Sequence, residues 1–134
     1  MSGKNVETVQ GIYERWGQGD FRAGVELYDP HIVLVLRPEF PESGPHYGIE
    51  AIARYMRDDF LRDFTEPTIS GDEFLDAGDS VVVQVDQRAS GPRSGAPVGM
   101  RYYQVWTFRG DSVIRIESIM ERSDALHAAG LADG

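Results

Sequence analysis

Two polar side chains stand alone in apolar surroundings near the C-terminal end of the chain. Residues 98–120 form two alternating runs joined by Arg-Gly-Asp at 109–111, a pattern that predicts a long β-hairpin. Gln104 interrupts the apolar row of the first strand, and Ser118 interrupts that of the second. A few polar groups among apolar neighbours are typical of a small-molecule pocket. Gln104 is therefore a candidate hydrogen-bond donor to a ligand carbonyl, or a core amide satisfied by its neighbours.

A second polar pattern, Gln84-x-Asp86, lies on the otherwise apolar predicted strand 80–88. A carboxylate partly removed from water has a raised pKa, which suits a general base. A nearby Arg37 or Arg88 would favour the charged form and oppose that rise. Asp86 is thus either a general base, with Gln84 or an arginine beside it, or the partner in a structural ion pair.

Large side chains spread along the chain could build an apolar wall for a ring-bearing ligand. With the polar groups beside them, the candidate ligand-binding residues are Tyr13, Trp16, Tyr47, Tyr55, Met56, Arg88, Tyr102, Trp106, Ile116, Ser118 and Met120. For any one of the aromatic residues, simple core packing is the competing interpretation. The three histidines have no metal-ligand spacing and the chain has no cysteine, so no metal site and no cofactor is expected.

Composition limits the classes of partner. A chain of 134 residues with 41% hydrophobic content fits one domain, residues 1–134, with a sizeable core. A net charge of −9 opposes binding to nucleic acid or to an anionic membrane surface. The polar N-terminus lacks the apolar segment of a signal peptide, so a cytoplasmic location is expected.

The elements that position these residues can be predicted from periodicity. Helical spacing predicts helices over 5–17, 20–28, 49–60 and 124–129, and apolar or alternating runs predict strands over 31–36, 68–75 and 80–88 before the central hairpin. Residues 37–47 and 90–99 are rich in proline and glycine and are predicted to be loops. Helices followed by a curved sheet of hairpins indicate an α+β domain, in which a sheet wrapped around the helix at 49–60 leaves an apolar hollow.

The order of several short fragments resembles a known family. These fragments are Trp16 with Gly19-Asp20, the Leu-Tyr-Asp-Pro at 27–30, Tyr47-Gly48, the Asp-Ala-Gly-Asp at 76–79 before three valines, the Val-Trp-Thr-Phe-Arg at 105–109 and the tail at 125–131. Together they resemble a SnoaL-like, polyketide cyclase-like protein of the nuclear transport factor 2-like superfamily, over nearly the whole chain. The resemblance implies a cone-shaped fold, with N-terminal helices on a strongly curved, mostly antiparallel mixed sheet around an apolar pocket, and a homodimer formed through the outer sheet face.

The resemblance also assigns roles to positions. The superfamily includes ketosteroid isomerases, polyketide cyclases, limonene epoxide hydrolase and non-catalytic members. The aspartate base of the isomerases, which precedes a proline, is replaced here by Arg37, and their oxyanion-binding aspartate by Gln104. Of the water-activating residues of the epoxide hydrolase, Asp86 is retained, whereas Gln84 and either Ser118 or Glu117 occupy the other places.

The resemblance further places the row Val82, Gln84, Asp86 and Arg88 toward the pocket. Two hypotheses remain. The chain is a cofactor-independent isomerase, cyclase or hydrolase acting on an apolar molecule through Asp86, or it is a non-catalytic ligand-binding or dimerisation domain. An outer apolar row is expected to form the homodimer contact; its members are Val81, Val83, Val85, Tyr103, Val105 and Ile119.

Overall fold

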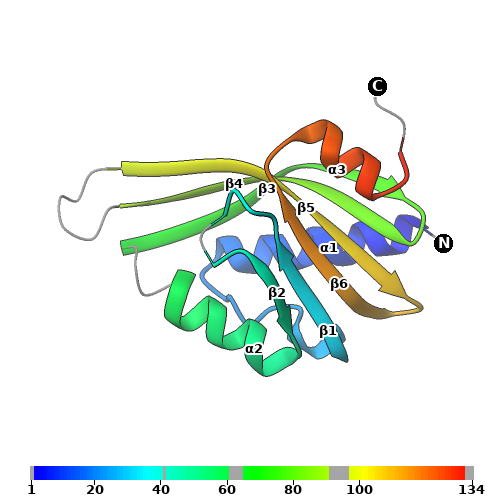
Figure 1. Ribbon diagram of the computed structural model, residues 1–134, viewed down its shortest axis with the longest axis horizontal. Coiled ribbons are helices and arrows are strands. Elements are labelled where there is room, and N and C mark those ends of the chain that lie inside the picture. The colour runs from blue at the N-terminus through cyan, green and yellow to red at the C-terminus, as the bar shows by residue number, and fades with distance from the viewer. Residues whose placement is uncertain (1, 41, 61–64, 91–96, 132–134) are drawn as a thin grey trace.

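A single strongly curved sheet carries the helices on both of its faces (Figure 1). The computed structural model describes residues 2–40, 42–60, 65–90 and 97–131. Within these residues the elements are α1 (Ser2–Gly17), η1 (Val25–Leu27), β1 (Tyr28–Leu36), β2 (Gly44–Tyr47), α2 (Ile49–Arg54), η2 (Tyr55–Phe60), β3 (Thr65–Ala77), β4 (Ser80–Ser90), β5 (Pro97–Arg109), β6 (Ser112–Ile119) and α3 (Arg122–Ala128). The predicted α+β class is confirmed.

The described strands form one six-stranded mixed sheet in the order β2-β1-β6-β5-β4-β3. β1 runs parallel to β6, and the other neighbouring pairs are antiparallel. The predicted central hairpin is present as β5 and β6, and Gly110 has a φ of 62° in its turn. A left-handed backbone of this kind favours glycine, which explains the turn signal in the sequence.

A bulge in β6 changes which side chains share a face. Thr107 pairs with Arg115 and the next pair is Phe108 with Val113, so Ile114 is the extra residue. Simple alternation would place Val113 and Ile116 on opposite faces, but the bulge brings both into the inner core. The inner position of Val113 is therefore a consequence of the bulge and not of alternation along the strand.

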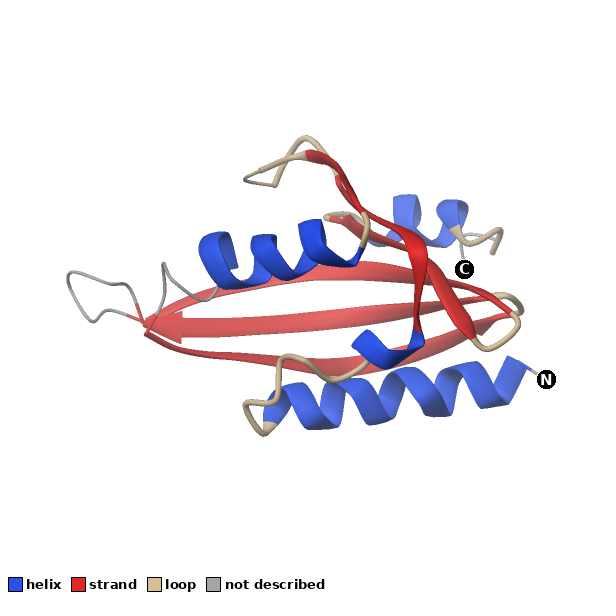
Figure 2. Cartoon of the chain, turned by 90° about the horizontal axis from the view of Figure 1, so that it is seen from below, coloured by secondary structure: helices blue, strands red, loops and turns tan. Residues whose placement is uncertain are grey.

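The inner face of the sheet packs against α1. Val9, Ile12, Tyr13 and Trp16 recur at helical spacing, and all four are buried against the sheet. The outer face packs against α3 through a smaller cluster that includes Val82, Val105, Ile119 and Ala125. Figure 2 shows α1 and α2 along the inner side of the long strands, with α3 on the far side. Side chains that alternate along one strand thus enter two separate environments.

Three predicted segments differ from the observed ones. The 37–47 segment was predicted as a loop, but it contains β2, an edge strand whose Pro45 lies opposite Val35. An edge strand tolerates proline because one side of its backbone needs no sheet partner. The helix predicted at 20–28 shrinks to turns and the three-residue η1, and the helix predicted at 49–60 is α2 continued by the π-helical η2.

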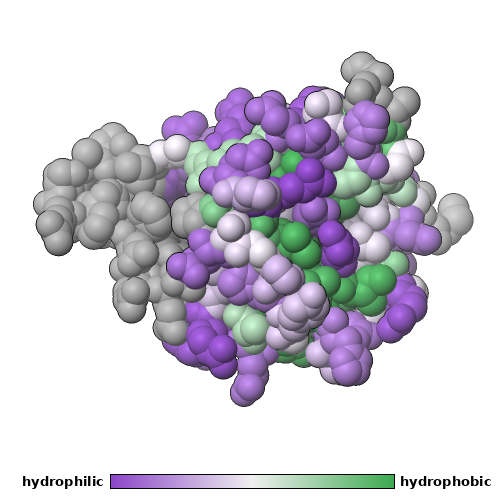
Figure 3. Space-filling model, in the orientation of Figure 1, coloured by the Kyte–Doolittle hydropathy of each residue, from purple (hydrophilic) through white to green (hydrophobic). Residues whose placement is uncertain are grey.

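The surface in the view of Figure 1 is mostly hydrophilic, with a strip of hydrophobic colour over the region of β1 and β6 (Figure 3). Ile32, Leu34 and Leu36 of β1 are buried in the inner core, so the half-buried Val33 and Val35 lie on the opposite, outer face.

In the part of the chain that the structure describes, no helix has the length and apolar character needed to cross a bilayer.

Candidate functional site

A cavity of about 410 Å³ lies between the inner sheet face, α1 and α2. Its volume is within the range of roughly 300–1,000 Å³ found for small-molecule pockets. Its lining is mainly apolar and aromatic: Trp16, Phe21, Arg22, Val25, Tyr28, Leu34, Leu36, Phe40, Glu42, Ile49, Ile52, Ala53, Tyr55, Met56, Arg57, Ile69, Gln87, Met100, Tyr102, Gln104, Ile116 and Ser118.

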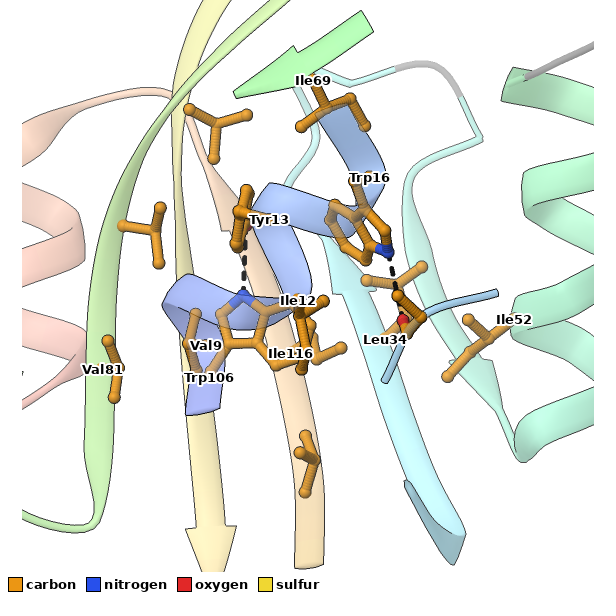
Figure 4. Packing of buried hydrophobic residues seen from close by; sticks show 14 of the residues in the cluster. Val9, Ile12, Tyr13, Trp16, Leu34, Ile52, Ile69, Val81, Trp106 and Ile116 are labelled. Carbon is orange, nitrogen blue, oxygen red and sulfur yellow. Dashed lines mark hydrogen bonds between the residues drawn. The ribbon is translucent and has the colours of Figure 1, made fainter. Parts of the chain in front are cut away.

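The aromatic side chains of α1 fix one wall of this cavity. Trp16 points from α1 toward the side of Leu34 and Ile52, and its indole N–H donates to the Ala23 carbonyl at 3.1 Å (Figure 4). Tyr13, one turn earlier, packs against Trp16 with ring centroids 4.8 Å apart. Because each ring has both packing neighbours and a polar partner, the wall is held in one arrangement.

A chain of hydrogen bonds leads from the core to the cavity. The Trp106 indole donates to the Tyr13 hydroxyl at 3.2 Å, and the Tyr13 hydroxyl donates to Oε1 of Gln104. Gln104 in turn donates from Nε2 to Oγ of Ser118 at 3.2 Å, across the β5–β6 pair. Gln104 and Ser118 line the cavity, whereas Tyr13 and Trp106 lie behind them. The chain therefore ends in two neutral polar groups at an apolar cavity.

The donor pattern fixes the orientation of the Gln104 amide. The Trp106 indole can only donate, so it occupies an acceptor site of the Tyr13 oxygen. The buried Tyr13 hydroxyl must then donate its own hydrogen, and the amide oxygen of Gln104 accepts it. The amide NH₂ group is left on the other side, where one hydrogen goes to Ser118. No described residue accepts its second hydrogen or the Ser118 hydroxyl hydrogen, and both residues line the cavity.

A second tyrosine–glutamine pair lines the same cavity. The Tyr102 hydroxyl donates to Oε1 of Gln87 at 2.9 Å. Gln87 follows Val81, Val83 and Val85 on the inner row of β4, and it escaped the sequence analysis. The residues of β4 gave no signal for it, because the successive valines at 81–83 fit either assignment of the two faces.

Burial keeps these tyrosines protonated. Desolvation raises the pKa of Tyr13 well above its ordinary value of 10.0, and the nearby Tyr102 adds to the rise. Desolvation, with a smaller contribution from Tyr55, raises the pKa of Tyr102 as well. Both hydroxyls are therefore donors at any physiological pH. Tyr28, also in the lining, has its pKa raised by desolvation and by Glu26.

Charged side chains occur only where the described lining reaches solvent. Arg22, Glu42 and Arg57 line the cavity and are exposed. Glu42 is the one carboxylate among the described lining residues, and its backbone has a φ of 58°. A positive φ is uncommon for a residue other than glycine. Among the described residues no three histidine, aspartate or glutamate side chains are grouped as metal ligands.

Apart from the four residues Arg37, Gln84, Asp86 and Arg88, the predicted site residues separate into three groups. Trp16, Tyr55, Met56, Tyr102, Gln104, Ile116 and Ser118 line the cavity. Tyr13, Trp106 and Met120 pack in or against the inner core and do not line the cavity. Tyr47 is 73% exposed, so its expected place in an apolar wall is wrong.

The predicted orientation of Asp86 toward the pocket is also wrong. Val81, Val83 and Val85 enter the inner core, and Val82 enters the outer cluster under α3. Alternation then places Asp86 on the outer face. Its side chain is 16% exposed and forms ion pairs with Arg88 at 3.1 Å and Arg101 at 3.9 Å. These contacts match the ion-pair interpretation of Asp86.

The other polar residues expected beside Asp86 share its face. Gln84 and Arg88 alternate with the inner valines and do not line the cavity. Arg37 donates to Glu117 at 2.8 Å, and Arg115 contacts the same carboxylate at 3.2 Å. The predicted pocket roles of Gln84, Arg37 and Arg88 therefore lose their geometric basis.

The expected outer apolar row needs the same correction. Val81, Val83 and Val85 face the inner core, so they cannot contact a second subunit. Val105 and Ile119 do lie on the outer face, but they are buried against α3. The resemblance implied the opposite assignment of the two faces of β4, and the valines at 81–83 fit either one. The homodimer itself stays a prediction.

The curved sheet, its inner helices and the enclosed cavity define a nuclear transport factor 2-like fold. Solved structures of this class are similar over nearly the whole chain. A candidate SnoaL-like polyketide cyclase from Jannaschia sp. CCS1 has a TM-score of 0.74 and 20% identity, with 98% of this chain and 94% of that chain covered. TerC co-crystallised with polyporic acid has a TM-score of 0.72 and 20% identity, with 93% and 96% covered.

A protein with a ketosteroid isomerase-like fold from Catenulispora acidiphila, in complex with trimethylamine, has a TM-score of 0.67 and 17% identity, with 94% of both chains covered. At these identities the similarity shows the fold alone. A comparison with curated proteins finds no match. The family model of the SnoaL-like domain matches residues 9–116, and the chain belongs to this family.

Proposed function

We propose that this SnoaL-like domain binds an apolar, ring-bearing small molecule whose carbonyl oxygen accepts hydrogen bonds from Gln104 and Ser118. The observation that carries the proposal is the buried chain from Trp106 through Tyr13, which ends in these two groups at the cavity. The apolar lining supplies most of the binding free energy, and the polar pair orients the ligand.

A carbonyl oxygen suits the two free donors best. It has two lone pairs, which match one N–H of Gln104 and the O–H of Ser118. A charged oxygen would have to lose its hydration among Trp16, Leu34 and Ile116, whereas the two cations of the described lining, Arg22 and Arg57, are exposed. The proposed ligand is therefore neutral where it meets Gln104.

Ligand content and one matched pair of variants test this proposal. Native mass spectrometry of the purified protein is expected to show a bound small molecule, released unchanged on denaturation. Gln104→Leu should lose this ligand, because an apolar side chain of similar size offers no donor. Gln84→Leu makes the same change on the outer face and should keep it. Retention of the ligand by Gln104→Leu would contradict the assignment.

Catalysis is a second candidate function, and Glu42 favours it. Two donors at a carbonyl also stabilise the negative charge that develops when a neighbouring carbon loses a proton. Glu42 is the one described carboxylate in the lining that could take this proton. Cofactor-independent isomerisation or cyclisation would then begin with this proton transfer to Glu42 rather than to Asp86, and hydrolysis with transfer of a proton from an attacking water to the same carboxylate. Conversion of the bound ligand by the parent protein, abolished in Glu42→Gln and retained in Asp86→Asn, is the expected result.

A homodimer through the outer face is part of the proposal and rests on less surface than expected. Val33 and Val35 are half-buried on that face, beside the ion pairs of Glu117. Sedimentation at micromolar concentration measures the mass directly. A dimer that dissociates in Val35→Asp would support this face, and a monomer in the parent protein would contradict it.

A further inference from the structure

Two glutamines of the inner face have the same arrangement. Gln104 on β5 and Gln87 on β4 both line the cavity. In each, the amide oxygen already accepts a hydrogen bond from a buried tyrosine hydroxyl, Tyr13 for Gln104 and Tyr102 for Gln87. Tyr13 is 3% exposed and Tyr102 is 6% exposed. The cavity thus contains two amides whose acceptor ends are occupied in the same way.

This arrangement turns both amides into donors toward the cavity. A glutamine amide offers two acceptor sites on its oxygen and two donors on its nitrogen. For Gln104, the Trp106 indole fixes the direction of the Tyr13 hydroxyl, so rotation of the amide by 180° would place an N–H against that hydroxyl hydrogen and lose a buried hydrogen bond. For Gln87, the amide oxygen faces the Tyr102 hydroxyl, which leaves the amide nitrogen as the donor toward the cavity.

The two donors lie far apart along the sheet. Gln87 pairs with Met100 across β4 and β5, and Met100 precedes Gln104 by four positions on the same strand. Four residues of strand span about 13 Å. Between these points Met100 and Tyr102 face the same side and line the cavity. The cavity wall is apolar between two separated hydrogen-bond donors.

Resting on the proposed function, we propose that the ligand is an elongated apolar molecule with a neutral acceptor oxygen at each end, one bound by Gln104 and the other by Gln87. Gln87 is then a specificity-determining residue that distinguishes ligands with two terminal carbonyls from ligands with one.

Two rigid probes that differ by one acetyl group test this inference. They are 4,4′-diacetylbiphenyl and 4-acetylbiphenyl, and their dissociation constants are measured by isothermal titration calorimetry. The parent protein is expected to bind the diacetyl probe roughly 3- to 10-fold more tightly, the contribution of one net hydrogen bond. Gln87→Leu should remove this preference, so that the variant binds both probes with equal affinity.

Control variants separate this inference from the proposed function. Gln84→Leu makes the same change on the outer face of the same strand and should keep the preference. Gln104→Leu should weaken the binding of both probes. Tyr102→Phe removes the hydroxyl that binds the Gln87 oxygen, so it should reduce the preference for the diacetyl probe and retain binding of both probes. Thermal denaturation establishes that each variant is folded.

The outcomes are distinct. Equal affinity of the parent protein for both probes, or a preference that survives in Gln87→Leu, overturns the role of Gln87 and leaves the carbonyl site at Gln104 intact. Failure of both probes to bind, together with a purified protein that contains no ligand, overturns the proposed function and this inference with it.

Discussion

Replacing Tyr13 with phenylalanine tests whether the buried hydrogen-bond chain holds the site together. The change removes one oxygen and keeps the ring that packs against Trp16 and Trp106. The Trp106 indole then has no acceptor and the Gln104 amide oxygen has no donor. A buried polar group left without a partner costs about 1–3 kcal/mol, so the free energy of unfolding should fall by at least about 2 kcal/mol.

Urea denaturation followed by tryptophan fluorescence measures this loss. For a domain of this size, at an m-value of about 2 kcal/mol/M, the midpoint should move down by about 1 M. Tyr47→Phe is the matched control, because Tyr47 is 73% exposed. Its effect should stay within about 0.5 kcal/mol. A Tyr13→Phe variant as stable as Tyr47→Phe would refute the claim that the hydroxyl satisfies two buried groups.

Three further predictions concern the rest of the molecule. Asp86→Asn should leave the affinity for 4,4′-diacetylbiphenyl unchanged in calorimetry, and a tenfold loss would place that carboxylate back at the cavity. Gly24→Ala should lower the unfolding free energy by about 1–3 kcal/mol, because Gly24 has a φ of 94° and an added Cβ would meet Ile12 at 2.9 Å. Gly11→Ala is the control and should not lower it, because Gly11 lies in α1 with open space around it. Burial raises the pKa of Tyr102, so the unfolded state loses this proton first as the pH rises. The contribution of Tyr102 to the free energy of unfolding should therefore be fully present below pH ~10 and decrease above it. Denaturation midpoints measured across this range check the sign, and a midpoint that rises with pH would contradict it.

The fold could be predicted from the sequence because its strongest signals are local. Helical spacing in α1 and the turn at Gly110 each depend on a few neighbouring residues. The boundaries of the helices and strands were harder to predict. β2 exists only because the edge of β1 is available for pairing, and a proline-containing tetrapeptide carries no strand signal of its own.

The orientation of β4 could not be deduced from its own residues. Three successive valines at 81–83 fit either parity, and the decision comes from elsewhere in the chain. α3 supplies Ala125 and Leu126 as cover for the outer face, so an apolar residue such as Val82 is buried there as well. With both faces apolar, hydrophobicity alone does not say which one faces the cavity.

Polar chemistry, rather than hydrophobicity, separates the two faces of the sheet. On the outer face, charged groups pair with one another, as Asp86 does with Arg88 and Glu117 with Arg37. On the inner face, the buried polar groups are neutral, and each amide is fixed by a tyrosine. A buried charge needs a partner, whereas a neutral amide needs only a hydrogen bond, which a ligand oxygen can supply. The same rule that excludes Asp86 from the cavity is the reason why we propose Gln104 and Gln87 as the residues that bind the ligand.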